Sequence, residues 1–143
     1  MQERSVLFVD DDEIFLQMLE ICLRDEGYEK HFARSCAEAL DILRREEVHV
    51  LVVDMVMPKM DGLALVKIVK KKYPHIVSMV LSAYAQPADV MTVMIQQGLY
   101  RYVPKPWTFD REFVAVVRGA VGNYEALRKH ENHLPESKPC SDR

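Results

Sequence analysis

Four consecutive acidic residues, Asp10 to Glu13, follow the apolar run VLFV at Val6–Val9. Like charges in a partly dehydrated site repel one another, so an acidic cluster at the end of a buried segment is costly unless a cation compensates it. A second apolar run, LVVDMVMPKMDG, carries Asp54. If the two runs are neighbouring parallel strands, Asp10, Asp11 and Asp54 converge at one sheet edge. Carboxylate oxygens with open positions suit Mg²⁺, so the sequence predicts a metal site.

Two further chemically active side chains follow other apolar or aromatic runs. Ser82 lies near the end of IVSMVLSA, and Lys105 follows LYRYVP. A hydroxyl and an ammonium at the same edge as a metal-bound carboxylate are typical of phosphoryl transfer, in which they stabilise the equatorial oxygens. Asp12 and Glu13 instead fall at the start of a predicted helix, where carboxylates cap free N–H groups and meet the positive end of the dipole.

Alternating strands and helices must position these residues. Nearly continuous apolar runs predict strands at 5–9, 48–55 and 76–83, and two more polar runs predict edge strands at 28–33 and 99–104. The alternation predicts an α/β, doubly wound, flavodoxin-like fold with five helices and five parallel strands in the order 2-1-3-4-5. Ligands of such a fold bind at the carboxyl ends of the strands. Helical spacing is present at Ile14, Met18, Leu19 and Cys22; at Ala39, Leu40 and Leu43; at Leu65, Ile68 and Val69; and at Val90, Val93 and Met94.

The last predicted helix is longer than a five-unit domain needs. Its apolar stripe runs from Phe109 to about Asn132, a rod of roughly 35 Å whose final turns should project from the globule. We therefore expect a domain at 1–125 and, at 126–143, the end of the helix followed by a polar tail or linker. The second segment is too short for a helix-turn-helix, so we expect no direct contact with nucleic acid.

Composition narrows the class of protein. The 143 residues, 49% of them hydrophobic, predict one globular unit. Nineteen Lys and Arg against 22 Asp and Glu give a net charge of −3, which offers no general attraction to nucleic acid or an anionic membrane. The apolar runs are too short to cross a bilayer, which predicts a cytoplasmic protein without membrane contact. The three cysteines include no CxxC pair, which predicts reduced thiols.

The motifs LFVDDDE, VVDMVMPKMDG, LSA and YVPKPW together have the order and spacing of one family. Over about residues 5–125 the chain closely resembles the receiver domain of two-component response regulators. The resemblance implies that Asp54 accepts a phosphoryl group and that Asp10 and Asp11 are the acidic pair of a Mg²⁺ site, with Mn²⁺ as an alternative ion. Asp11 is then the direct ligand, and the backbone carbonyl of Val56 is another.

The same resemblance implies roles for residues around the phosphoryl group. Ser82 and Lys105 contact it, Ser82 and Tyr102 form the conformational switch, and Val56 and Tyr84 flank the path of the hydrolytic water. The expected partners are a sensor histidine kinase or phosphotransfer protein and a downstream output domain or protein, with a phosphorylation-dependent homodimer as a further expectation. Such a protein is a self-phosphorylating and self-dephosphorylating switch, not a turnover enzyme.

Other classes fit the residues less well. A phosphatase similar to the haloacid dehalogenases would use Asp54 as nucleophile but needs a second Asp two residues later as acid/base, where this chain has Val56. A nucleotide-binding enzyme needs a glycine-rich loop after the first strand, where this chain has carboxylates. A stand-alone receiver that signals only by docking and the receiver portion of a longer regulator both remain open. The extended helix favours the second.

Overall fold

The computed structural model describes residues 4–55, 57, 62–82, 92, 95–96, 99, 101–105 and 111–133, with side chains described up to residue 126. Nine elements lie within these ranges. The strands are β1 (Ser5–Val9), β2 (Glu29–Ala33), β3 (Val50–Asp54), β4 (Val77–Ser82) and β5 (Arg101–Pro104). The helices are α1 (Glu13–Cys22), α2 (Cys36–Arg45), α3 (Gly62–Lys72) and α5 (Arg111–His133).

The five strands form one parallel sheet in the order β2-β1-β3-β4-β5, as the alternation of elements predicts. Every residue of β1, β3 and β4 is buried, whereas β2 and β5 at the edges are partly exposed. Pro104 has no backbone N–H to donate, and it lies opposite Ser82 on the edge strand, where this loss is tolerated.

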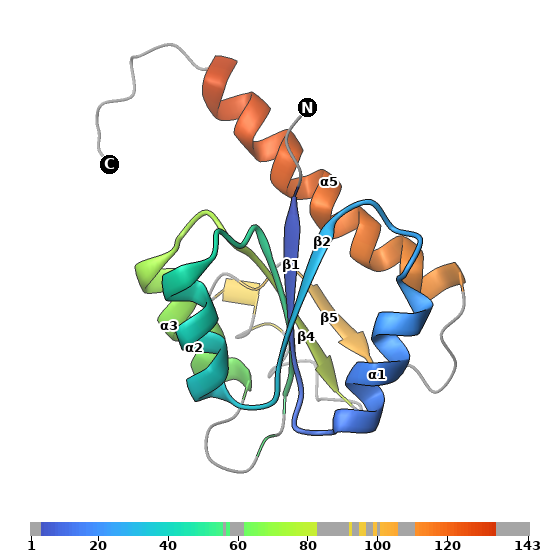
Figure 1. The fold of residues 1–143 in the computed structure, drawn as a ribbon. Helices are drawn as coiled ribbons and strands as arrows, with labels where there is room; N and C mark the ends of the chain where they lie inside the picture. Colours follow the sequence, from blue (N-terminus) through green and yellow to red (C-terminus); the bar gives the residue numbers. More distant parts are fainter. Residues whose placement is uncertain are drawn as a thin grey trace.

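Helices cover both faces of the sheet (Figure 1). Alternate residues of a strand point to opposite faces, so Leu7 and Val9 join one core with α2 and α3, while Val6 and Phe8 join the other with α1 and α5. All five strands are parallel, so their carboxyl ends lie at one edge of the sheet. Ligands of such sheets bind at these ends.

The apolar residues whose spacing predicted α1 are only partly the residues that this helix buries. Phe15, Leu16 and Leu19 pack into the core, whereas Ile14 is 71% exposed and Met18 44% exposed. The helix has apolar residues on most of its circumference, so spacing alone did not define the buried side. Ile14, Met18 and Ile21 therefore form an exposed apolar face.

The predicted long C-terminal helix is confirmed from Arg111, and its last turns extend past the sheet (Figure 1). Phe109, the predicted first residue of that helix, lies outside the described residues, as do Val90, Val93 and Met94 of the predicted fourth helix. Cys22 and Cys36, the cysteines among the described residues, do not form a disulfide. Within the described ranges, every helix is too short or too polar to cross a bilayer.

Candidate functional site

Three carboxylates meet at the carboxyl edge of β1 and β3. Asp10 directly follows β1, and Asp54 is the last residue of β3, the strand beside it. One oxygen each of Asp10, Asp11 and Asp54 lies within 4.8 Å of the other two, close enough to ligate one cation. Asp10 and Asp54 are buried and Asp11 is exposed. The predicted convergence of these three residues is confirmed.

Lys105 reaches this cluster from the end of β5. Its backbone N–H donates to the Ser82 carbonyl at 2.6 Å, which fixes the start of the side chain. Its Nζ atom lies 2.8 Å from Asp10 Oδ2 and 3.8 Å from Asp54 Oδ1. The ammonium also lies 4.4 Å from the centre of the Phe15 ring. One cation thus faces two buried carboxylates and an aromatic ring.

Burial and mutual repulsion make the site electrostatically demanding. Burial, followed by the charge of Asp10, raises the pKa of Asp54 to about 6. Burial also raises the pKa of Asp10, although the hydrogen bond from Lys105 opposes this shift. Burial by itself would lower the pKa of Lys105, but the hydrogen bond and charge of Asp10 outweigh it and raise that pKa. A second cation would therefore stabilise the ionised carboxylates.

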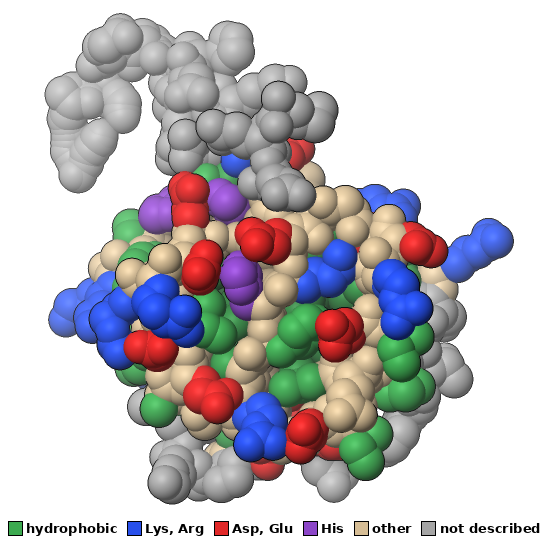
Figure 2. Space-filling model, in the orientation of Figure 1, with side chains coloured by type: hydrophobic (Ala, Val, Ile, Leu, Met, Phe, Trp, Pro, Cys, Tyr) green, Lys and Arg blue, Asp and Glu red, His purple; other side chains and the backbone are tan. Residues whose placement is uncertain are grey.

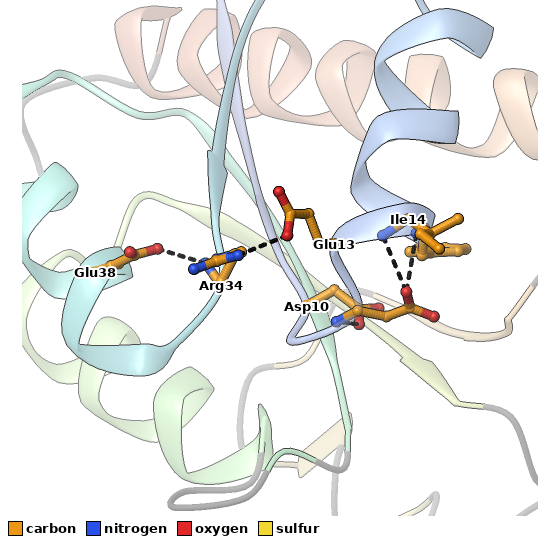
Figure 3. Close-up of polar contacts among 7 residues, drawn as sticks. Asp10, Glu13, Ile14, Arg34 and Glu38 are labelled. Carbon is orange, nitrogen blue, oxygen red and sulfur yellow. Dashed lines mark hydrogen bonds and ion pairs between the residues drawn. The ribbon is translucent and has the colours of Figure 1, made fainter.

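The other acidic residues of the run have structural partners. Asp12 is the N-cap of α1, and its Oδ1 atom accepts the N–H groups of Ile14 and Phe15 at 3.1 and 3.2 Å. Glu13 accepts a hydrogen bond of 2.8 Å from the Arg34 side chain, as Figure 3 shows. The predicted division of the run into two cluster carboxylates and two helix-start carboxylates is confirmed.

Two further predicted site residues lie on β4 and β5. Ser82 is buried at the end of β4, beside Pro104 at the end of β5. Tyr102 is half-buried, pairs with Val80 across the strands, and packs against the core shared with α2 and α3. Val56 and Tyr84, predicted to flank a water path, lie outside the described residues.

Gly62 is a residue of the site that sequence reasoning missed. A Cβ atom at this position would lie 2.2 Å from the backbone oxygen of Asp54. The Gly62 N–H also donates to the Met55 carbonyl at 2.7 Å, so the start of α3 is held against the end of β3. The available signal was the glycine of VVDMVMPKMDG, because glycine permits such a close backbone approach.

Comparison with known protein families identifies the family to which this chain belongs. The model of the response regulator receiver domain matches residues 6–118. The chain belongs to this family. Receiver domains are the phosphorylated signalling domains of two-component systems, so the fold and family expectations from the sequence motifs are confirmed.

Relatives of this receiver domain include longer regulators. The DNA-binding transcriptional regulator NtrC of Klebsiella pneumoniae is 34% identical over 142 residues, which cover 99% of this chain and 30% of that protein. The signal receiver domain of an HD domain-containing protein from Pseudomonas fluorescens Pf-5 superposes with a TM-score of 0.79 at 29% identity, covering 87% of this chain and 99% of that one. The beryllofluoride-activated NtrC4 receiver domain dimer superposes with a TM-score of 0.76 at 28% identity, covering 84% of this chain and 98% of that one. The receiver domain thus spans less than a third of its NtrC relative.

Proposed function

We propose that Asp54 is the phosphoacceptor of this receiver domain. The observation that carries the proposal is the position of its carboxylate at the sheet edge, beside Asp10 and the Lys105 ammonium. An Asp54 oxygen attacks phosphorus and forms an acyl phosphate. The bond from phosphorus to the donor, a phosphohistidine nitrogen or the acetate oxygen of acetyl phosphate, breaks and leaves its electron pair on the donor. The donor is a sensor histidine kinase, a phosphotransfer protein or a small acyl phosphate.

The carboxylate cluster fits a hard divalent cation because its donor set consists of oxygens only. Asp10 already has both oxygens engaged, one by the Asp12 N–H at 2.8 Å and the other by Lys105. The exposed Asp11 is therefore the direct carboxylate ligand together with Asp54, while Asp10 shapes the site, and the Val56 carbonyl completes the set. When bound, Mg²⁺ or Mn²⁺ supplies positive charge for the phosphoryl oxygens.

Ser82 and Lys105 stabilise the phosphoryl group once it is on Asp54. The buried Ser82 hydroxyl donates to one oxygen, and the Lys105 ammonium, 3.8 Å from Asp54 beforehand, pairs with another. Movement of Ser82 toward the phosphate makes room for Tyr102 to rotate inward from its half-buried position, which changes the β5 surface. Val56 and Tyr84 carry no acid or amide to orient water, so the acyl phosphate is long-lived. The domain is a switch and not a turnover enzyme.

Protein partners contact two regions of the domain. A phosphohistidine must enter at the carboxyl edge, where α1 begins. Figure 2 shows hydrophobic side chains exposed among charged ones on the side of the molecule that carries α1, and α1 has an exposed apolar face. Ile14, Met18 and Ile21 form this face, which suits an apolar partner surface. The unit at 1–125 then signals through the segment at 126–143, the end of the extended helix followed by a tail or linker, to an output domain or protein. A phosphorylation-dependent homodimer is supported by the activated NtrC4 receiver dimer. The net charge of −3 gives no support for direct nucleic-acid binding.

Intact-mass measurement after incubation with acetyl phosphate tests the phosphoacceptor. We expect one added phosphoryl group with Mg²⁺ and none with a chelator. Asp54→Asn should abolish the addition, because an amide is a poor nucleophile toward phosphorus.

Asp25→Asn is the matched control, because Asp25 is exposed in the turn after α1, at the far end of that helix from the cluster. Borohydride reduction of the acyl phosphate, followed by peptide sequencing, locates the modified residue. Equal phosphorylation of Asp54→Asn and wild type, or a label on another residue, would refute the assignment.

A further inference from the structure

An aromatic ring lies beside the lysine at the carboxylate cluster. The Phe15 ring faces the Lys105 ammonium, with 4.4 Å between Nζ and the ring centre. The Lys105 side chain is 18% exposed and Phe15 is 8% exposed, so little water screens the contact. A cation over an aromatic face is attracted by the ring quadrupole, and more strongly where water is excluded.

Phe15 is fixed in place from two directions. Its backbone N–H lies in the first turn of α1 and donates to the Asp12 cap at 3.2 Å. Its ring belongs to the core between the sheet and the helices α1 and α5. The Lys105 side chain, in contrast, has four rotatable methylenes and is held by its backbone at the end of β5. The ring is therefore the rigid member of the pair and the lysine the adjustable one.

The ring attracts the ammonium without taking up any of its N–H groups in a hydrogen bond. The ammonium is 2.8 Å from Asp10 but 3.8 Å from Asp54, so it must shift toward Asp54 to pair with a phosphoryl oxygen there. A carboxylate at position 15 would hold the ammonium back by a directional ionic hydrogen bond. An aromatic face permits the shift while still keeping the ammonium inside the site.

We propose that Phe15 is a positioning residue for phosphoryl transfer, holding the Lys105 ammonium over the Asp10 and Asp54 carboxylates through its ring face. The inference rests on the proposed function, because it needs Asp54 to be the phosphoacceptor. The role is electrostatic as well as steric. An apolar residue of similar size therefore does not replace it.

Site-specific incorporation of fluorinated phenylalanines at position 15 separates the two contributions. One, two and three ring fluorines withdraw electron density from the ring face in steps, while the size of the ring changes little. We expect the rate of phosphorylation by acetyl phosphate and Mg²⁺ to fall stepwise, by about fivefold to tenfold over the series. Phe15→Leu should be at least as slow as the trifluorinated protein.

The same series at Phe8 is the matched control. Phe8 is buried in the same core, where its ring stacks on Phe32 at 5.5 Å. A flat series at Phe8 together with a graded series at Phe15 supports the proposal. A flat series at Phe15, or equal slopes at both positions, overturns it while the phosphoacceptor assignment stands. Absence of phosphorylation in the wild-type protein would instead remove the proposed function, and this inference with it.

Discussion

Identical side chains in the acidic run differ in their surroundings. Asp10 is 2% exposed and paired with Lys105, whereas the neighbouring Asp11 is exposed and Asp12 caps α1. The peptide conformation at the turn from β1 to α1 sends successive side chains in different directions. The chemistry of each carboxylate is therefore set by its backbone position, which explains why the run tolerates four adjacent acids.

The raised pKa of Asp54 predicts a pH-dependent stability in metal-free buffer. Its folded pKa of about 6 exceeds the ordinary value of 3.8, so between these values the folded protein keeps a proton that the unfolded chain has lost. The free energy of unfolding should therefore fall as pH rises through this window, by roughly 1–3 kcal/mol. Mg²⁺ at ten times its dissociation constant should restore about 1.4 kcal/mol at pH 7.5.

Urea unfolding of wild type and Asp54→Asn, with and without Mg²⁺, measures this effect. The asparagine variant should lack most of the fall with pH and most of the stabilisation by Mg²⁺. Parallel pH profiles for the two proteins would contradict the prediction.

The sequence predicted the carboxylate cluster but not the ring beside the lysine. Strand ends of a parallel sheet share one edge, so Asp10, Asp11 and Asp54 could be brought together by topology alone. The contact between Phe15 and Lys105 depends instead on which side of α1 packs inward. Apolar residues surround most of α1, and only packing against the sheet and α5 selects Phe15 over Ile14 as the buried residue.

At the scale of elements, the start of α3 determines how the end of β3 is held. The N–H of Gly62 bonds to the carbonyl of Met55, whose own N–H bonds to Leu81 of β4 at 2.8 Å. The helix, the acidic strand end and the neighbouring strand are thus joined within a few residues of Asp54. The apolar runs predicted the positions of the strands, although four of the five strands are shorter than the runs. The close contact at Gly62 is a tertiary feature that the periodicity of the sequence does not report.

Replacement of Gly62 by alanine should be strongly destabilising. The new Cβ would lie 2.2 Å from the Asp54 backbone oxygen, and because that neighbour is backbone, α3 must move. We expect a loss of about 3 kcal/mol in the free energy of unfolding and slower phosphorylation. Chemical denaturation and the acetyl phosphate assay measure the two effects.

Gly122→Ala is the control for this substitution. Gly122 lies inside α5, and a Cβ there would meet nothing within 4 Å. Alanine should stabilise this helix by about 0.5–1 kcal/mol. Similar effects of the two substitutions would show that the contact between Gly62 and Asp54 is not tight.

At the scale of the whole molecule, α5 is attached at the end of the sheet opposite the carboxylates. The Arg4 side chain bonds to Glu125 at 3.1 Å and lies over the Tyr124 ring, which in turn contacts His49 at the start of β3. A bidentate ion pair between Arg118 and Glu26 adds a second attachment. The helix therefore links the loop after α1 with the strand starts.

Protonation of His49 should loosen this attachment. Its Nδ1 atom accepts the Ser5 N–H at 3.0 Å, so the neutral ring carries its hydrogen on Nε2. Burial lowers the pKa of His49, with Arg4 and His75 adding to the shift and Glu47, 3.6 Å away, opposing it. Below pH 6.5 the unfolded chain binds a proton that the folded protein excludes, so stability falls as pH decreases, by at most about 1.4 kcal/mol per unit.

Hydrogen exchange of α5 at pH 7.5 and 5.5 reports this change locally. After correction for the intrinsic pH dependence of amide exchange, the protection factors of α5 should be smaller at the lower pH in the wild-type protein. His49→Asn should be less stable at pH 7.5, because it loses the contact with Tyr124, but its exchange should depend less on pH. A pH response of α5 that is the same in both proteins would contradict the assignment.

The opposed ends of the molecule have a practical consequence for attaching probes. Ser5 at the start of β1 and the last turn of α5 lie on the side away from Asp10 and Asp54 (Figure 1). Because Ser5 is buried, the last turn of α5 is the better of the two places, and a dye, a purification tag or a sensor surface coupled there leaves the acidic edge pointing outward. Immobilised molecules should therefore all present the same edge to a donor in solution, which makes binding measured on a chip comparable with binding measured in free solution.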